Sequence, residues 1–230
     1  MLIKTHGIEI NLPEDEPNHK YAAFSIYKEI FIHNCYDIET IKKISNKCSN
    51  KIIWDIGSHI GLFSLLCKLN IPNCQIHSFE VLPNRIDAQI KILEKYSDIN
   101  IHNIHFLGFC EDIEKCKKYI SKQDDNYINV YTHTIKNIEQ ISVTKFFEKY
   151  NTIPDIIKID MEGGEAGIFE ELKSLNILKD IKFITGEWHF DKAYDYITQE
   201  LIKDFYVSTK RIDKNNNWNT FTAINRIFSF

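Results

Sequence analysis

The 230-residue sequence lacks the features that would place it in a membrane or outside the cell. No apolar run approaches the roughly 18 residues that a membrane-spanning helix requires. The segment from Met1 to Pro17 carries acids and prolines where a signal peptide would be apolar. We therefore expect a protein without a membrane span that stays in the cytoplasm.

Runs of basic residues and paired cysteines are missing as well. No run of lysine or arginine is longer than two residues, and the formal net charge is −4. Binding to nucleic-acid phosphates needs a basic stripe, so nucleic acid is not an expected partner. The six cysteines form no C-x-x-C pair and no zinc-like spacing with histidine. They indicate reduced thiols of a cytosolic protein rather than a disulfide or zinc framework.

Short apolar segments alternate with amphipathic ones over most of the chain. The periodicity predicts strands at 51–56, 75–79, 104–109, 154–159 and 181–185, helices at 61–69, 84–96, 165–175 and 192–202, and a closing hairpin of strands at 206–212 and 221–227. Ahead of them we expect an extended or hairpin segment at 1–12 and helices at 20–36 and 38–46. The polar stretch 111–140 is expected to be an insertion.

Strands that alternate with helices predict a mostly parallel sheet covered on both faces. The hairpin at the end adds an antiparallel strand to that sheet. The expected fold class is therefore α/β, a single domain over 1–230. It consists of an N-terminal strand and helix extension (1–48) and a Rossmann-like core (50–230), a size that one hydrophobic core can support.

The loop after the first strand of the core has the features of a nucleotide site. It reads Asp55-Ile-Gly57-Ser58-His59-Ile-Gly61 and runs from a buried strand into a helix. Glycines permit positive φ and close backbone approach, and the helix start presents unpaired N–H groups to a ligand. A dinucleotide fingerprint would also need glycines two and five positions after the first, and these are absent. Asp55 is placed to accept a hydrogen bond from an ammonium group of the cofactor.

A second acid, Glu80, ends the next expected strand. A carboxylate there faces the same crevice and can accept hydrogen bonds from both hydroxyls of a ribose. The loop and Glu80 together fit a cofactor that contains adenosine. Glu111, just past the third expected strand, is our candidate for a contact to adenine, and a solvated loop acid explains it equally well.

At this point the sequence resembles the FkbM-type methyltransferases in three blocks. These are Asp55 to Leu62, Phe79-Glu80 with Pro83-Asn84 after it, and Lys158-Ile-Asp-Met-Glu-Gly-Gly-Glu165, which looks very like the family's K-I-D-x-E-G-x-E. The resemblance spans roughly residues 50 to 190 and departs from the pattern where Val81-Leu82 separate Glu80 from Pro83.

The resemblance implies a class I methyltransferase fold with S-adenosylmethionine as the methyl donor, S-adenosylhomocysteine as the product and a hydroxyl oxygen as the usual acceptor. Gly57, Ser58, His59 and Gly61 would then line the cofactor, with His59 near its methionine moiety. Together with a composition typical of an AT-rich bacterial genome, the resemblance suggests a sugar or sugar nucleotide of surface (capsular) polysaccharide as the acceptor. A phosphoramidate, lipid, polyketide or peptide group remains an alternative, as does an NAD-dependent dehydrogenase.

Ionisable side chains follow the fourth and fifth expected strands. Asp160 and Glu162 come after the fourth, and Glu187 and His189 after the fifth. In an extended chain, Glu187 and His189 point the same way because they are two residues apart. We predict a catalytic centre of His189, Asp160 and Glu187, in which His189 is the general base and Asp160 positions the acceptor or assists its deprotonation.

Other roles for these residues stay open. A divalent cation such as Mg²⁺ would use Asp160 and Glu187 as oxygen ligands, although no metal site is predicted. Glu162 and Glu165 have the simpler interpretation that they cap the following helix, because acids are favourable at a helix N-terminus. For His189, a surface or packing role is the alternative.

Overall fold

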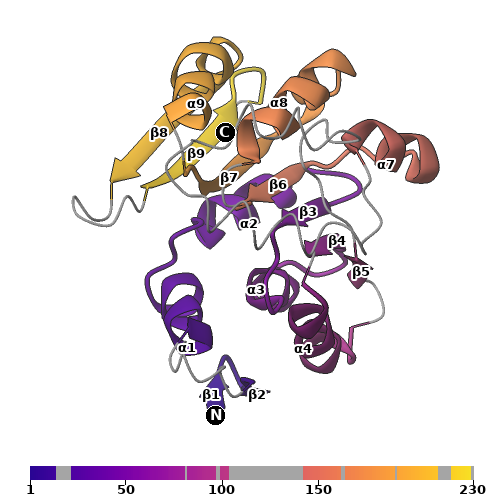
Figure 1. Cartoon of the computed structure of the whole chain (residues 1–230), viewed down its shortest axis with the longest axis vertical. Coiled ribbons are helices and arrows are strands. Elements are labelled where there is room, and N and C mark those ends of the chain that lie inside the picture. Colours follow the sequence, from indigo (N-terminus) through magenta and orange to yellow (C-terminus); the bar gives the residue numbers. More distant parts are fainter. Residues whose placement is uncertain are drawn as a thin grey trace.

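The computed structural model describes residues 1–13, 22–80, 82–96, 99–103, 142–161, 164–189, 191–211 and 219–228. Within them, one sheet of seven strands has the order β5-β4-β3-β6-β7-β9-β8 (Figure 1). The strands are β3 (Ile52–Ile56), β4 (Gln75–Glu80), β5 (Ile99–Asn103), β6 (Ile156–Ile159), β7 (Phe183–Glu187), β8 (Phe205–Arg211) and β9 (Asn219–Asn225).

The first five strands of this sheet are parallel, whereas β9 runs antiparallel to both β7 and β8. The predicted α/β class, a mostly parallel sheet with a closing antiparallel hairpin, is confirmed. Strand β5 occupies the place expected for the third strand. The predicted segment 104–109 lies outside the described residues.

Helices cover both faces of the sheet (Figure 1). After β3 they are α3 (Leu62–Asn70), α4 (Pro83–Leu93), α7 (Val143–Tyr150), α8 (Glu165–Ser174), the 3₁₀ turn η2 (Leu178–Asp180), α9 (Asp191–Asp195), the π-helical turn η3 (Tyr196–Glu200) and the 3₁₀ turn η4 (Leu201–Lys203). None of the helices in the described ranges is both long and apolar enough to cross a membrane.

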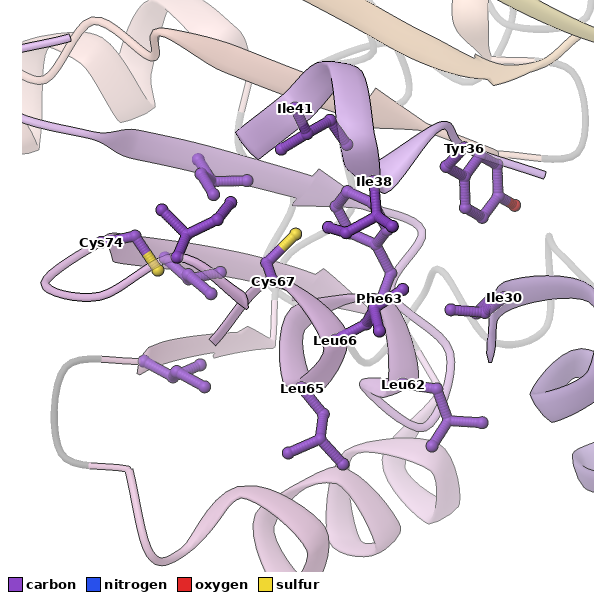
Figure 2. Packing of buried hydrophobic residues seen from close by; sticks show 14 of the residues in the cluster. Ile30, Tyr36, Ile38, Ile41, Leu62, Phe63, Leu65, Leu66, Cys67 and Cys74 are labelled. Atoms are coloured by element: carbon purple, nitrogen blue, oxygen red, sulfur yellow. The ribbon is translucent and has the colours of Figure 1, made fainter. Parts of the chain in front are cut away.

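The N-terminal extension belongs to the layer that covers the α3 face of the sheet, where it shares one buried cluster with β3 and α3. It comprises a separate hairpin of β1 (Leu2–Thr5) and β2 (Ile8–Asn11), then α1 (Ala22–Tyr27), the π-helical turn η1 (Lys28–Ile32) and α2 (Ile38–Ser45). Figure 2 shows side chains from this layer, among them Tyr36, Ile38 and Ile41, beside those of α3. The ring of Tyr36 meets that of Phe63 edge-on, with centroids 5.5 Å apart.

Successive residues of a central strand enter two different cores. Ile53 packs with α2 and α3, whereas Trp54 packs with α7 and α8 on the opposite face, and both side chains are fully buried. A strand covered on both faces buries every side chain, which explains the continuous apolar pattern. Because the five strands from β5 to β7 are parallel, their carboxyl ends all lie at one edge of the sheet. Ligands bind at this edge in open α/β sheets.

Candidate active site

The loop between β3 and α3 packs closely against the carboxyl ends of β4 and β6. Gly57 has φ +72°, and a Cβ atom there would lie 1.7 Å from the carbonyl oxygen of Asp160. The backbone N–H groups of Gly57 and Ser58 both donate to the carbonyl oxygen of Phe79, at 3.1 and 2.9 Å. Glycine is required at position 57 because any side chain would push the loop away from β6.

Glu80 holds the same loop from the end of β4. Its Oε2 accepts a hydrogen bond from the backbone N–H of His59 at 2.8 Å, and its Oε1 accepts one from Leu82 N–H at 3.0 Å. A further residue, Gln89 of α4, donates to Ser58 Oγ and to the carbonyl oxygen of His59. Sequence reasoning missed Gln89, because nothing in a helical pattern marks which polar residue faces a loop.

His59 lies within this loop with a left-handed backbone, at φ +52°. Its buried Nδ1 has no hydrogen-bond partner among the described residues. Burial, reinforced by the positive charges of Arg85 and Lys158, lowers the pKa of His59 to about 3. The side chain is therefore neutral at physiological pH, and a contact of its ring with a cofactor stays a prediction.

Asp55 is fully buried at the end of β3. Its Oδ2 accepts a hydrogen bond from Ser64 Oγ at 2.7 Å, and its Oδ1 lies 3.4 Å from Lys158 Nζ. These contacts anchor the start of α3 and a buried ammonium. The contact to a cofactor ammonium stays a prediction.

Lys158 of β6 is the buried cation of the site, with only 3% of its surface exposed. Its Nζ donates to the carbonyl oxygen of Gly57 at 2.6 Å and lies 3.7 Å from Asp160 Oδ2. Burial alone would lower the pKa of Lys158, but Asp55 and Asp160 outweigh it and raise the pKa. Sequence reasoning assigned Lys158 no role. The available signal was a lysine inside a strand buried on both faces, which must be paired.

The three predicted catalytic side chains meet at the ends of β6 and β7. His189 Nε2 lies 3.8 Å from Asp160 Oδ1 and 3.8 Å from Glu187 Oε2. All three offer a ligand atom within 4.8 Å of one another, so the cluster has the donor set for one divalent cation. Two other predicted acids, Glu111 and Glu162, lie outside the described residues.

Glu165 orients the imidazole of His189. Its Oε1 lies 2.9 Å from His189 Nδ1 and also accepts the backbone N–H of Met161, at 3.1 Å. A carboxylate acceptor assigns the proton to Nδ1, which leaves Nε2 directed at Asp160 and Glu187. Helix capping is the simpler interpretation of Glu165. Its fully buried side chain also contacts His189, a residue of the predicted catalytic centre, so capping alone does not describe it.

The two carboxylates of the cluster differ in charge. Burial and the neighbouring Asp160 raise the pKa of Glu187 to about 8. Burial also acts to raise the pKa of Asp160, but Lys158, His189 and a hydrogen bond from the Tyr36 hydroxyl, at 3.1 Å, lower it below its ordinary value. At neutral pH the cluster thus contains an ionised Asp160 beside a largely protonated Glu187.

Comparisons with known proteins identify the family to which this chain is similar. Residues 55–211 match the family model of the methyltransferase FkbM domain. A stretch of 64 residues is 47% identical to methyltransferase sdnD of Sordaria araneosa and covers 28% of this chain but only 22% of that protein. Over 185 residues the chain is 24% identical to methyltransferase 1 of Beauveria bassiana (strain ARSEF 2860), covering 68% of this chain and 70% of that protein.

A solved structure with the same fold is the METTL16 methyltransferase domain. Its TM-score is 0.54 at 13% sequence identity, with 96% of this chain and 74% of that chain covered. At such low identity the likeness shows the fold alone. The predicted class I methyltransferase fold is thereby confirmed.

Proposed function

Because this chain belongs to the FkbM methyltransferase family and is therefore an S-adenosylmethionine-dependent methyltransferase, we propose that it methylates a hydroxyl oxygen of its acceptor, with His189 as the general base. The observation that carries this proposal is the line of contacts from Glu165 through His189 to Asp160, at the carboxyl ends of β6 and β7. The base would remove the hydroxyl proton as the oxygen attacks.

The residues around the loop fit S-adenosylmethionine. The loop carries the unpartnered Nδ1 of His59, and Glu80 stands at the end of β4 where a ribose would lie. A carboxylate can accept about four hydrogen bonds, so one at this position can bind ribose hydroxyls as well as backbone N–H groups. Gly57, Ser58, Gly61 and Asp55 would complete the cofactor site.

The cofactor supplies an activated methyl group on a sulfonium, whose sulfur keeps the bonding electron pair when it leaves. The chain's own residues have to place the acceptor oxygen in line with that methyl group, since positioning alone is worth up to roughly 7–11 kcal/mol. His189 Nε2 receives the hydroxyl proton, and Asp160 stabilises the imidazolium that forms. General-base assistance of this kind contributes about 10²–10⁴-fold in rate.

The acceptor in this proposal is a sugar or sugar nucleotide of bacterial surface polysaccharide. Its support is the carbohydrate chemistry implied by the family resemblance and the composition of the chain. A hydroxyl is favoured over an already nucleophilic amine because the cluster provides an oriented base. Asp160 and Glu187 would contact the hydroxyl that neighbours the reacting one.

The experiment that tests the proposal is calorimetric titration with S-adenosylhomocysteine and, separately, NAD⁺. We expect micromolar affinity for the homocysteine compound, none for NAD⁺, and a loss of at least about tenfold in Glu80→Gln. Glu39→Gln, on an exposed turn of α2, is the matched control. Absence of S-adenosylhomocysteine binding to the wild type, or equal loss in the control, would contradict the proposed cofactor site.

Methyl transfer to oxygen is tested with deuterated S-adenosylmethionine and a panel of nucleotide sugars. Mass spectrometry and NMR of the product should place a trideuteromethyl group on a carbohydrate oxygen. Methylation of a nitrogen, or of a lipid or peptide acceptor only, would overturn the assignment to sugar hydroxyls and leave the methyltransferase activity standing.

A further inference from the structure

A cavity of about 680 Å³ lies between the N-terminal extension and the closing hairpin. This volume is in the range of sites for small-molecule ligands. The residues that line it come from α1, η1 and the loop after it on one side, and from β8 and β9 on the other. Among them are Lys28, Glu29, Asn34 and Cys35 on the first side, and Lys210 and Thr220 on the second.

The cavity adjoins the predicted catalytic cluster. Thr220, on its β9 wall, is the cross-strand partner of Glu187. Glu29, on its N-terminal wall, is close enough to Asp160 for that charge to raise its pKa. Cys35 immediately precedes Tyr36, whose hydroxyl donates to Asp160. The walls of the cavity therefore include direct neighbours of the residues that form the cluster.

Most of this lining lies outside the part of the chain that matches the family. The match ends at residue 211 and begins at residue 55, so the segment Ser25–Cys35 and the β9 residues Thr220–Thr222 are not covered by it. The cofactor loop and the cluster are inside the match. Much of the cavity wall thus lies outside the family match, whereas Ser208 and Lys210 of β8 lie inside it.

Most of the described residues around the cavity have polar side chains, and lysines outnumber carboxylates among them. Lys28 and Lys210 lie on opposite walls, with the Lys28 ammonium over the ring of Phe24, and Glu29 is the carboxylate among the described lining residues. Burial, followed by the charge of Asp160, raises the pKa of Glu29 to about 7, which weakens its negative charge near neutral pH. The serine and threonine hydroxyls and the Asn34 amide offer hydrogen bonds to a hydroxylated molecule.

We propose that this cavity is the acceptor site and that it selects a phosphorylated acceptor, with Lys28 and Lys210 facing the phosphate. The inference rests on the proposed function, since it places the acceptor of that reaction. The phosphate could be a sugar phosphate monoester or the diphosphate of a nucleotide sugar. Both present the same chemistry, oxygen anions attached to a hydroxylated ring, to the two ammonium groups.

The probes that distinguish the two sources are orthophosphate for the monoester and pyrophosphate for the diphosphate. Each is titrated into the ¹⁵N-labelled full-length protein while the backbone amides of Thr220 and Thr222 are followed by NMR. We expect saturable shifts at these amides with at least one probe, and an affinity reduced about tenfold in Lys28→Glu/Lys210→Glu. The control is Lys43→Glu/Lys91→Glu, which makes the same charge change at exposed helix positions.

No shift at Thr220 and Thr222 with either probe, or equal weakening in the control variant, would overturn the proposal. Titration of the same samples with S-adenosylhomocysteine separates this result from a failure of the proposed function. Intact S-adenosylhomocysteine binding without anion binding rejects only the phosphorylated acceptor. Anion binding without S-adenosylhomocysteine binding rejects the cofactor site instead.

Discussion

Lys158 Nζ donates a 2.6 Å hydrogen bond to the carbonyl oxygen of Gly57, a residue 101 positions earlier in the chain. This bond joins the two most characteristic blocks of the sequence, the cofactor loop and the strand that carries Asp160. The same ammonium lies 3.7 Å from Asp160 Oδ2. The charge on Asp160 and the shape of the loop therefore both depend on one buried side chain.

Gly57→Ala is expected to destabilise the contact between the cofactor loop and the end of β6. The new Cβ would lie 1.7 Å from the Asp160 carbonyl oxygen, so β3 or β6 must shift, and we expect a loss of about 3 kcal/mol or more in the free energy of unfolding. Gly7→Ala is the matched control, because Gly7 has a similar φ of +75° but nothing within 4 Å of its Cβ. The free energies of unfolding of both variants are measured by chemical denaturation. Equal losses in the two variants would contradict the steric argument.

Removing the base and removing its orienting carboxylate should have different consequences. His189→Gln is expected to lower kcat by about 10²–10⁴-fold with little change in the affinity for S-adenosylhomocysteine. Glu165→Gln, which retains an acceptor for the Met161 N–H, should lower kcat by about tenfold and leave the acceptor KM nearly unchanged. A Glu165→Gln enzyme with full kcat would show that the 2.9 Å contact to His189 has no catalytic role.

The raised pKa of Glu187 predicts a specific dependence of stability on pH. Because folding raises this pKa from 4.5 to about 8, the folded protein binds more protons than the unfolded chain across that window, and its stability falls as pH rises. The variant Glu187→Gln should therefore gain stability relative to the wild type between pH 5 and pH 7. The titration of a single group changes the stability difference between the variant and the wild type by at most about 1.4 kcal/mol per pH unit.

This measurement uses urea denaturation of the cofactor-free protein in the presence of EDTA. Asp160, His189, Lys158 and Glu29 surround the carboxyl group, so its removal also changes their pKa values, and the difference reports the titration of Glu187 together with this coupling. The matched control is Glu39→Gln on the exposed face of α2. A stability difference that stays constant from pH 5 to pH 7 would show that Glu187 ionises at its ordinary pKa.

The base mechanism predicts that turnover does not need a divalent cation. Dialysis against EDTA should leave kcat unchanged, since His189 Nε2 accepts the proton without a metal. If EDTA instead abolishes activity, a metal site is the structural explanation, because Asp160, Glu187 and His189 have ligand atoms within 4.8 Å of one another. Loss of activity in EDTA and recovery with Mg²⁺ or Mn²⁺ would reassign the three side chains as metal ligands.

Local pattern was sufficient for much of the architecture. Alternation of strands and helices predicted the mostly parallel sheet, and the glycine loop after β3, Glu80 and Asp160 were placed at strand ends by counting along the chain. These features depend on periodicity and on the conformational freedom of glycine, which neighbouring residues determine. Even the approach of Glu187 to His189, 3.8 Å apart, followed from their spacing of two residues.

Contacts between distant segments were decided only by the tertiary structure. Lys158 to Gly57, Tyr36 to Asp160 and Glu165 to His189 each require the register of the sheet or the packing of a helix against it. A buried charge has to be paired, so the sequence indicates that Lys158 has a partner but does not indicate which residue it is. The N-terminal segment and the closing hairpin enclose a cavity only because chain packing brings α1, η1 and β9 to the edge where β6 and β7 end.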